Sequence, residues 1–129
     1  MAKRIREKAA ANAENKDKRL YAVAKYIRIT PSKVRIVMDL VRGKTYREAA
    51  AILKNTPNKA AEAVLKTLES AAANGENNRS LNKDDMYVAE IYVGQGPTLK
   101  RMNIRARGRV DQILKRTSHI TVILDTKAE

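Results

Sequence analysis

Three arginines stand on alternate residues around a single glycine in the stretch IRARGRVDQ, residues 104–112. They are Arg105, Arg107 and Arg109, and Gly108 separates the last two. A guanidinium group can donate two parallel hydrogen bonds to a phosphate and can stack on a nucleobase. Glycine allows a positive φ or a close approach of the backbone to another surface. The pattern is typical either of a solvated turn or of the tip of a polyanion-binding arm.

The distribution of charge along the chain favours binding. The 129 residues include 27 Lys+Arg and 14 Asp+Glu, which gives a formal net charge of +13. Residues 1–35 hold 11 basic and 3 acidic residues, residues 36–97 hold 8 of each, and residues 98–116 hold 7 basic residues against Asp111 alone. A balanced middle between two cationic segments indicates a surface for a polyanion, RNA or DNA.

Composition excludes several other classes of protein. The chain has no Cys, which excludes disulfides and thiolate zinc sites and is consistent with a reducing compartment. No run approaches the roughly 18 apolar residues of a spanning helix, and the first residues lack the apolar segment of a signal peptide. We therefore expect a cytoplasmic protein without a membrane span, with a length that suits one domain.

The coarse pattern predicts an α+β fold, in which three helices pack on a small antiparallel three-stranded sheet and a long basic β-hairpin protrudes. Runs rich in Tyr, Val and Ile at residues 20–29, 86–93 and 119–124 predict the strands. A first helix is predicted with Thr30 as its N-cap and Pro31 as its first residue, and it ends near Gly43. Its buried stripe recurs at helical spacing and consists of Val34, Val37, Met38 and Val41.

Two further helices follow. Thr45 and Glu48 form a capping box that opens a short helix ending near Asn55. A third helix is predicted from Thr56-Pro57 to Gly75, and residues 76–85 predict a polar loop. The apolar face of the third helix comprises Ala61, Val64, Leu65, Leu68, Ala71 and Ala72.

The chain divides into two parts. Residues 1–19 alternate charges and alanines without an apolar face, which predicts a basic mobile tail that becomes helical when bound. Residues 20–129 predict a single α+β domain that includes an extended hairpin over residues 97–119.

The hairpin itself has too little apolar surface to hold itself rigid. Its arms are predicted over residues 98–107 and 109–124, turning near Gly108, after the stretch GQGP at 94–97 bends or bulges the preceding strand. Neither face of the first arm is continuously apolar, and two-stranded ribbons are marginal in water. An arm of about ten residues would reach about 30 Å from the body, and its composition calls for an anionic partner.

Catalytic and metal-binding patterns are absent or weak. His119 is the only histidine, and we expect it to be a strand residue with a hydrogen-bonded ring. Ser118 points to the opposite face and cannot form a nucleophile–base pair with it. We therefore predict no enzyme, no metal and no cofactor. Two alternatives remain: a free nucleic-acid-binding chaperone that inserts the hairpin into a groove, and a nuclease using Asp84, Asp85 and Glu90.

Several segments in a fixed order carry a resemblance to a known family, among them PSKVR at 31–35, GPTLKR at 96–101 and KRTSHITV at 115–122. Over residues 22–125 the sequence resembles the bacterial-type large-subunit ribosomal protein twenty-two family. The most specific part is a spaced motif made of Lys100, Arg105-Ala106, Gly108-Arg109, His119-Ile120, Val122 and Leu124. The family often has a proline just before the tip arginine, where this chain has Ile104.

The resemblance implies a structural constituent of the large ribosomal subunit, with its body on the outer surface near the exit of the peptide tunnel. It implies partners: large-subunit rRNA, neighbouring ribosomal proteins and the nascent chain, with one copy per ribosome and no homo-oligomer. It also implies help in early subunit assembly. The tip expected to line the tunnel is Arg105, Ala106, Arg107, Gly108, Arg109 and Val110. Residues expected to bind rRNA are Arg28, Lys33, Arg35, Lys100, Arg101, Arg105, Arg107, Arg109, Lys115 and Arg116.

Overall fold

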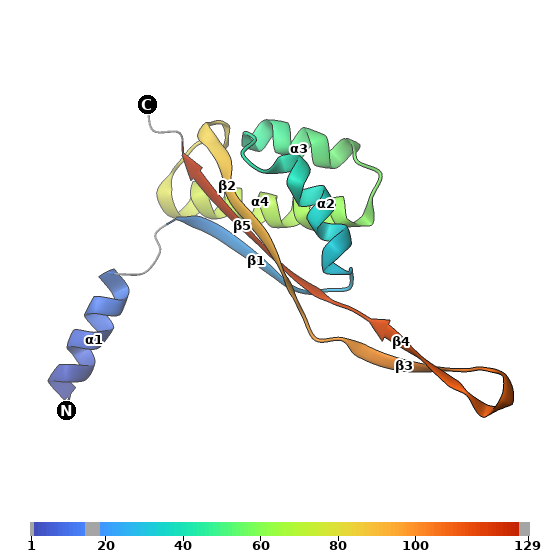
Figure 1. Ribbon diagram of the computed structural model, residues 1–129. Coiled ribbons are helices and arrows are strands. Elements are labelled where there is room, and N and C mark those ends of the chain that lie inside the picture. The colour runs from blue at the N-terminus through green and yellow to red at the C-terminus, as the bar shows by residue number, and fades with distance from the viewer. Residues whose placement is uncertain (1, 15–18, 127–129) are drawn as a thin grey trace.

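A computed structural model describes residues 2–14 and 19–126. The fold is α+β, with a three-stranded antiparallel sheet, a separate two-stranded hairpin and four α-helices in the described residues. Figure 1 shows α2, α3 and α4 gathered beside the sheet, the hairpin projecting away from them, and α1 standing apart. The elements are α1 (Ala2–Glu14), β1 (Leu20–Ile27), α2 (Pro31–Val41), α3 (Tyr46–Asn55), α4 (Lys59–Arg79), β2 (Met86–Gln95), β3 (Leu99–Ile104), β4 (Val110–Lys115) and β5 (Ser118–Thr126).

The prediction of three helices is wrong by one. The additional helix, α1, occupies most of the segment predicted as a tail, residues 1–19. Its sequence has no apolar stripe, and residues 3–12 are all exposed. Residues 1 and 15–18 of that segment lie outside the described residues, and mobility of the tail stays a prediction. None of the helices in the described part of the chain has the length and hydropathy of a membrane span.

The sheet has β5 at its centre, between β1 and β2. Alternate residues of each strand face the helices, so that one side of the sheet is buried and the other is open. The buried side and helices α2–α4 share one apolar core. The sheet residues in that core are Leu20, Ala22, Met86, Val88, Ile91, Ile120, Val122 and Leu124.

Helices α2 and α3 follow the local signals closely. The predicted stripe of α2 is fully confirmed, because its four members are all buried. Gly43 takes φ +73° just beyond the helix, and its N–H donates to the carbonyl of Val88 in β2. The capping box of α3 is present, with Glu48 N–H donating to Thr45 Oγ1 and the Glu48 carboxylate accepting from Thr45 N–H.

Both predicted ends of α4 are wrong. The helix begins at Lys59, because the Asn58 side chain accepts from Ala60 N–H at 2.9 Å, whereas the Thr56 hydroxyl donates back to Ile52 O. It also runs through Gly75 to Arg79. Gly75 is a packing residue: a Cβ there would lie 2.5 Å from Met86 Cε and 2.8 Å from Leu20 Cδ1, so both side chains would have to shift.

The end of β1 is held by His119. Tyr26 has φ +58°, an unfavourable value for a bulky residue, at the register shift between Ala24 and Ile27. Its N–H donates to His119 Nδ1 at 3.0 Å, and the two rings meet edge to face with centroids 4.9 Å apart. The prediction that His119 is a strand residue with a hydrogen-bonded ring is confirmed.

The hairpin joins the sheet at a buried polar joint. Gly96 N–H donates to Thr117 O at 2.9 Å, and the Thr117 hydroxyl donates to Pro97 O at 2.7 Å. A Cβ on Gly96 would overlap Thr117 Oγ1, so only glycine allows this approach. Ser118 beside it is fully buried, and within the described residues its hydroxyl has no hydrogen-bond partner. The stretch GQGP, predicted to bend or bulge the strand, forms this joint. The bulge of β2 lies earlier, between Val88 and Glu90.

The two neighbouring hydroxyls of the joint give a matched pair of variants. Thr117→Val keeps the shape but leaves Pro97 O unpaired, and we expect a loss of about 1–3 kcal/mol in the free energy of unfolding. Ser118→Ala removes a hydroxyl without a partner, and stability should be unchanged or higher. Urea unfolding measures both. A Thr117→Val protein as stable as the unmodified chain would contradict the assignment of the joint.

Candidate nucleic-acid interface

The basic hairpin is formed by six residue pairs, from Leu99↔Lys115 to Ile104↔Val110. Every residue of β3 and β4 is exposed. The prediction of one continuous second arm is wrong, because β4 ends at Lys115 and β5 begins at Ser118, after the joint. Each paired strand spans about 20 Å at about 3.4 Å per residue, so the paired region is shorter than the predicted arm.

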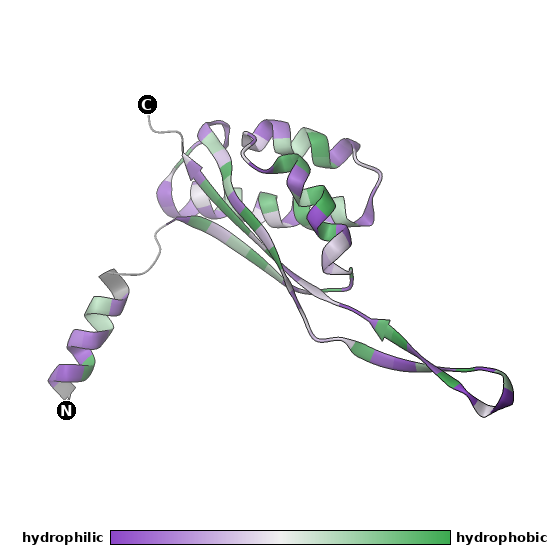
Figure 2. Ribbon diagram, viewed as in Figure 1, coloured by the Kyte–Doolittle hydropathy of each residue, from purple (hydrophilic) through white to green (hydrophobic). Residues whose placement is uncertain are grey.

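Pairing gives the hairpin two chemically different faces. Directly opposite residues share a face, and successive residues alternate between faces. One face carries Arg101, Lys115 and the Asn103–Asp111 pair, with Leu99 and Ile113 toward the body. The other carries Met102, Ile104, Val110 and Leu114, with Lys100 and Gln112 among them. Figure 2 shows hydrophilic and hydrophobic residues interspersed along both strands.

The apolar face is strongly exposed to solvent. Met102 is 79% exposed and Ile104 is 82% exposed, and nothing in the described residues covers them. The first arm by itself, residues 98–107, has no continuously apolar face in the sequence. The partner strand supplies Val110 and Leu114, which complete one. One face is a mixture of polar and apolar residues, the other is mainly apolar, and each carries cations. Such a ribbon is suited to a surface that offers both phosphates and flat apolar groups.

The tip is a tight turn with a defined backbone. Arg107 has φ +58° and Gly108 has φ +70°, and Arg105 N–H donates to Arg109 O at 2.8 Å. The Arg105 guanidinium also pairs with the Asp111 carboxylate at 2.6 Å across the neck of the turn. Arg107 and Arg109 form no ion pair with a described acidic residue, so the turn offers them to a partner.

Ile104, at the position where the family often has proline, continues β3 as the partner of Val110. A backbone N–H is therefore present at the last pair before the turn, where proline would remove one.

The predicted body residues lie at the end of the sheet from which the hairpin departs. Ile27 pairs with Ser118, so Arg28 lies near the joint (Figure 1). Lys33 and Arg35 are exposed on the first turns of α2, off its buried stripe. The structure therefore brings the body and hairpin cations to one end of the sheet. Sequence reasoning missed the joint residues Gly96 and Thr117, for which the only sequence signal was the glycine–proline pair.

Two of the three acidic residues named for the nuclease alternative form ion pairs with arginines. Asp84 accepts from Arg47 at 2.6 Å, and Glu90 pairs with Arg19 at 2.5 Å. Within residues 2–14 and 19–126, no three His, Asp or Glu side chains gather to hold a metal ion.

Comparison with known proteins decides the family. Residues 22–125 match the family described as Ribosomal protein L22p/L17e. The chain belongs to this family. It is 56% identical to the large ribosomal subunit protein uL22 of Desulforamulus reducens over 108 residues, 84% of this chain and 96% of the relative. It is 57% identical to the uL22 proteins of Clostridium novyi and Carboxydothermus hydrogenoformans, over 83% and 84% of this chain and 96% of each relative.

Family membership confirms the predicted resemblance over the residues given for it. It also confirms that the chain is a ribosomal protein and not an enzyme, and the nuclease alternative is wrong. The chain covers nearly the whole length of these relatives, so the comparison applies to the complete fold.

Gly108 gives a prediction for the tip. Gly108→Val forces a β-branched residue to φ +70°, which costs about 1 kcal/mol and lowers the population of the turn about fivefold. Affinity for an RNA that the hairpin binds should fall at least fivefold, without a change in salt dependence. Gly94→Ala is the control, since φ there is not positive and a Cβ meets nothing within 4 Å. Equal affinities in a filter-binding titration would contradict the proposed turn.

Proposed function

We propose that this protein is a structural constituent of the large ribosomal subunit and binds its rRNA through the hairpin and the adjacent end of the body. The observation that carries the proposal is the two-faced exposed hairpin in the segment that holds the family's most specific motif. The relatives named above are large-subunit proteins. Because the family is ribosomal, a free nucleic-acid chaperone is the weaker interpretation.

The cations of the hairpin neutralise backbone phosphates, and the face with Met102, Ile104, Val110 and Leu114 packs on bases. Lys115 pairs with Leu99 and Arg101 pairs with Ile113, so the two cations lie diagonally across the ladder on one face. The remaining proposed rRNA-binding residues on the hairpin are Lys100, Arg105, Arg107, Arg109 and Arg116. From the body, Arg28, Lys33 and Arg35 extend the same positive surface. Phosphate contacts of this kind fix position and orientation on the RNA.

The tip, Arg105 to Val110, lies at the wall of the peptide tunnel in this proposal, and the body lies at the outer surface of the subunit near the tunnel exit. The nascent chain then passes Arg107 and Gly108, and neighbouring ribosomal proteins contact the body. One copy serves each cytoplasmic ribosome, without a homo-oligomer. An arm that must touch several rRNA segments to become ordered also draws those segments together, which supports early assembly.

The dependence of RNA affinity on salt tests the phosphate contacts. Replacing both Arg101 and Lys115 by Gln removes two contacts, and each contact contributes about 0.7–0.9 to the slope of log K against log salt. The slope for a large-subunit rRNA fragment should therefore fall by about 1.4–1.8. The control is Lys54→Gln, an exposed lysine on α3, which should leave the slope unchanged. An unchanged slope in the double variant would contradict binding through this face.

A further inference from the structure

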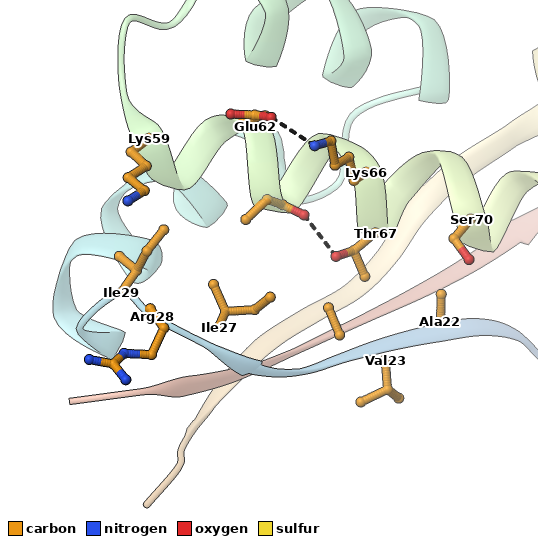
Figure 3. Close-up of a pocket in the computed structure, with 12 residues that line it drawn as sticks. Ala22, Val23, Ile27, Arg28, Ile29, Lys59, Glu62, Lys66, Thr67 and Ser70 are labelled. Carbon is orange, nitrogen blue, oxygen red and sulfur yellow. Dashed lines mark hydrogen bonds and ion pairs between the residues drawn. The ribbon is translucent and has the colours of Figure 1, made fainter. Parts of the chain in front are cut away.

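A cleft opens between the edge strand β1 and helix α4, and Arg28, near the joint, is one of its lining residues. Its volume is about 380 Å³, which is in the range of small-molecule sites. Figure 3 shows β1 on one side, α4 on the other, and Ile27 between them. Of the residues that line the cleft, the proposed function uses Arg28 alone.

The walls of the cleft are mainly apolar. Ile27 and Ile29 come from the β1 side, and Ala63 comes from α4. The Thr67 hydroxyl donates to Ala63 O at 2.8 Å, so its hydrogen is already used inside the helix. A flat apolar group would replace water here without leaving a wall group unpaired.

The edge of β1 contributes backbone hydrogen-bonding groups. Val23 lines the cleft, yet Figure 3 shows its side chain pointing away from α4, so the lining comes from its backbone. Tyr21 O accepts from Asn74 in α4 at 3.1 Å and therefore faces away from β5. Since alternate residues of an edge strand share that direction, Val23 presents both its N–H and its C=O to the cleft. The exposed Ser70 hydroxyl points toward β1 beside them.

This free edge is too short for an added strand. Tyr21 O is taken by Asn74, and the Tyr26 N–H donates to His119 of β5 and not to the free edge. The register shift between Ala24 and Ile27 also bends the strand. One N–H and C=O pair at Val23 suits the hydrogen-bonding edge of a single flat group, whereas strand addition needs a longer ladder.

The rim of the cleft is positive. Arg28, Lys59 and Lys66 surround it, with Glu62 as the one acidic lining residue. Lys66 donates to Glu62 at 2.7 Å, and this hydrogen bond with the lysine's charge lowers the pKa of Glu62 below its usual value. Glu62 is thus ionised at neutral pH and offsets Lys66. Arg28 and Lys59 then give the rim its excess positive charge.

We infer that this cleft holds an unpaired nucleobase of the rRNA. The base lies between β1 and α4 with its Watson–Crick edge on the Val23 backbone, and its phosphates meet Lys59 and Arg28. The inference rests on the proposed function, since it needs the RNA that the hairpin binds. Unpaired bases offer flat apolar faces and polar edges together, which is how proteins recognise RNA in loops and bulges.

Filling the cleft tests the inference. Ala63→Leu places a larger side chain in the cleft without changing a charge, and Ala51→Leu on an exposed position of α3 is the matched control. Large subunits assembled with each variant are probed with reagents that modify the Watson–Crick edges of unpaired bases. We expect one nucleotide, protected by the unmodified protein, to become at least fivefold more reactive with Ala63→Leu and not with Ala51→Leu.

Two further measurements keep the test decisive. If Ala63→Leu fails to fold, Lys59→Gln, which removes a cation of the rim that the proposed function does not use, should expose the same nucleotide. A photo-crosslinker at position 63 should couple to rRNA, and coupling to another protein would overturn the inference. The inference is also overturned if no nucleotide becomes more reactive with the cleft variants while the nucleotides protected by the hairpin stay protected. If the hairpin of the unmodified protein protects no rRNA nucleotide in assembled subunits, the proposed function is overturned instead.

Discussion

A two-stranded ribbon in water has no second layer against which to bury its side chains, and this constraint governs the whole molecule. The hairpin leaves Met102, Ile104 and the tip arginines exposed, and like charges near the tip repel one another. Only an external surface with phosphates and apolar groups can satisfy both faces. The structure is therefore divided between a body that folds around its own core and an arm that depends on its partner.

The body supplies what the arm lacks. Strand β5 lies at the centre of the sheet, and the Thr117 joint connects it directly to β4. The direction of the arm is therefore fixed by a core strand and by the close approach of Gly96. His119 holds the strained end of β1 at the same place, so the cations of body and arm face one region of a partner. The cleft beside α4 lies on the other edge of β1 and extends that surface.

Local signals in the sequence predict much of the fold. The stripe of α2 and the capping box of α3 depend on residues three or four apart, and the structure has both as predicted. The ends of α4 were mispredicted because Asn58 competes with Thr56 for the cap, and because Gly75 is needed for contacts with β2 and Leu20. The apolar face of the hairpin, the joint and the cleft all depend on partners distant in sequence. The segregated charge and the family resemblance together pointed to the candidate cations. Neither predicted that the cations of the body and of the hairpin lie at one end of the sheet.

The central claim is that the arm becomes ordered only on its RNA partner. Amide hydrogen exchange of β3 and β4, compared between the free protein and assembled large subunits, tests it most directly. The account predicts fast exchange of hairpin amides in the free protein and strong protection in the subunit, with the amides of β5 protected in both states. Equal, strong protection of the hairpin amides in the free protein would contradict it.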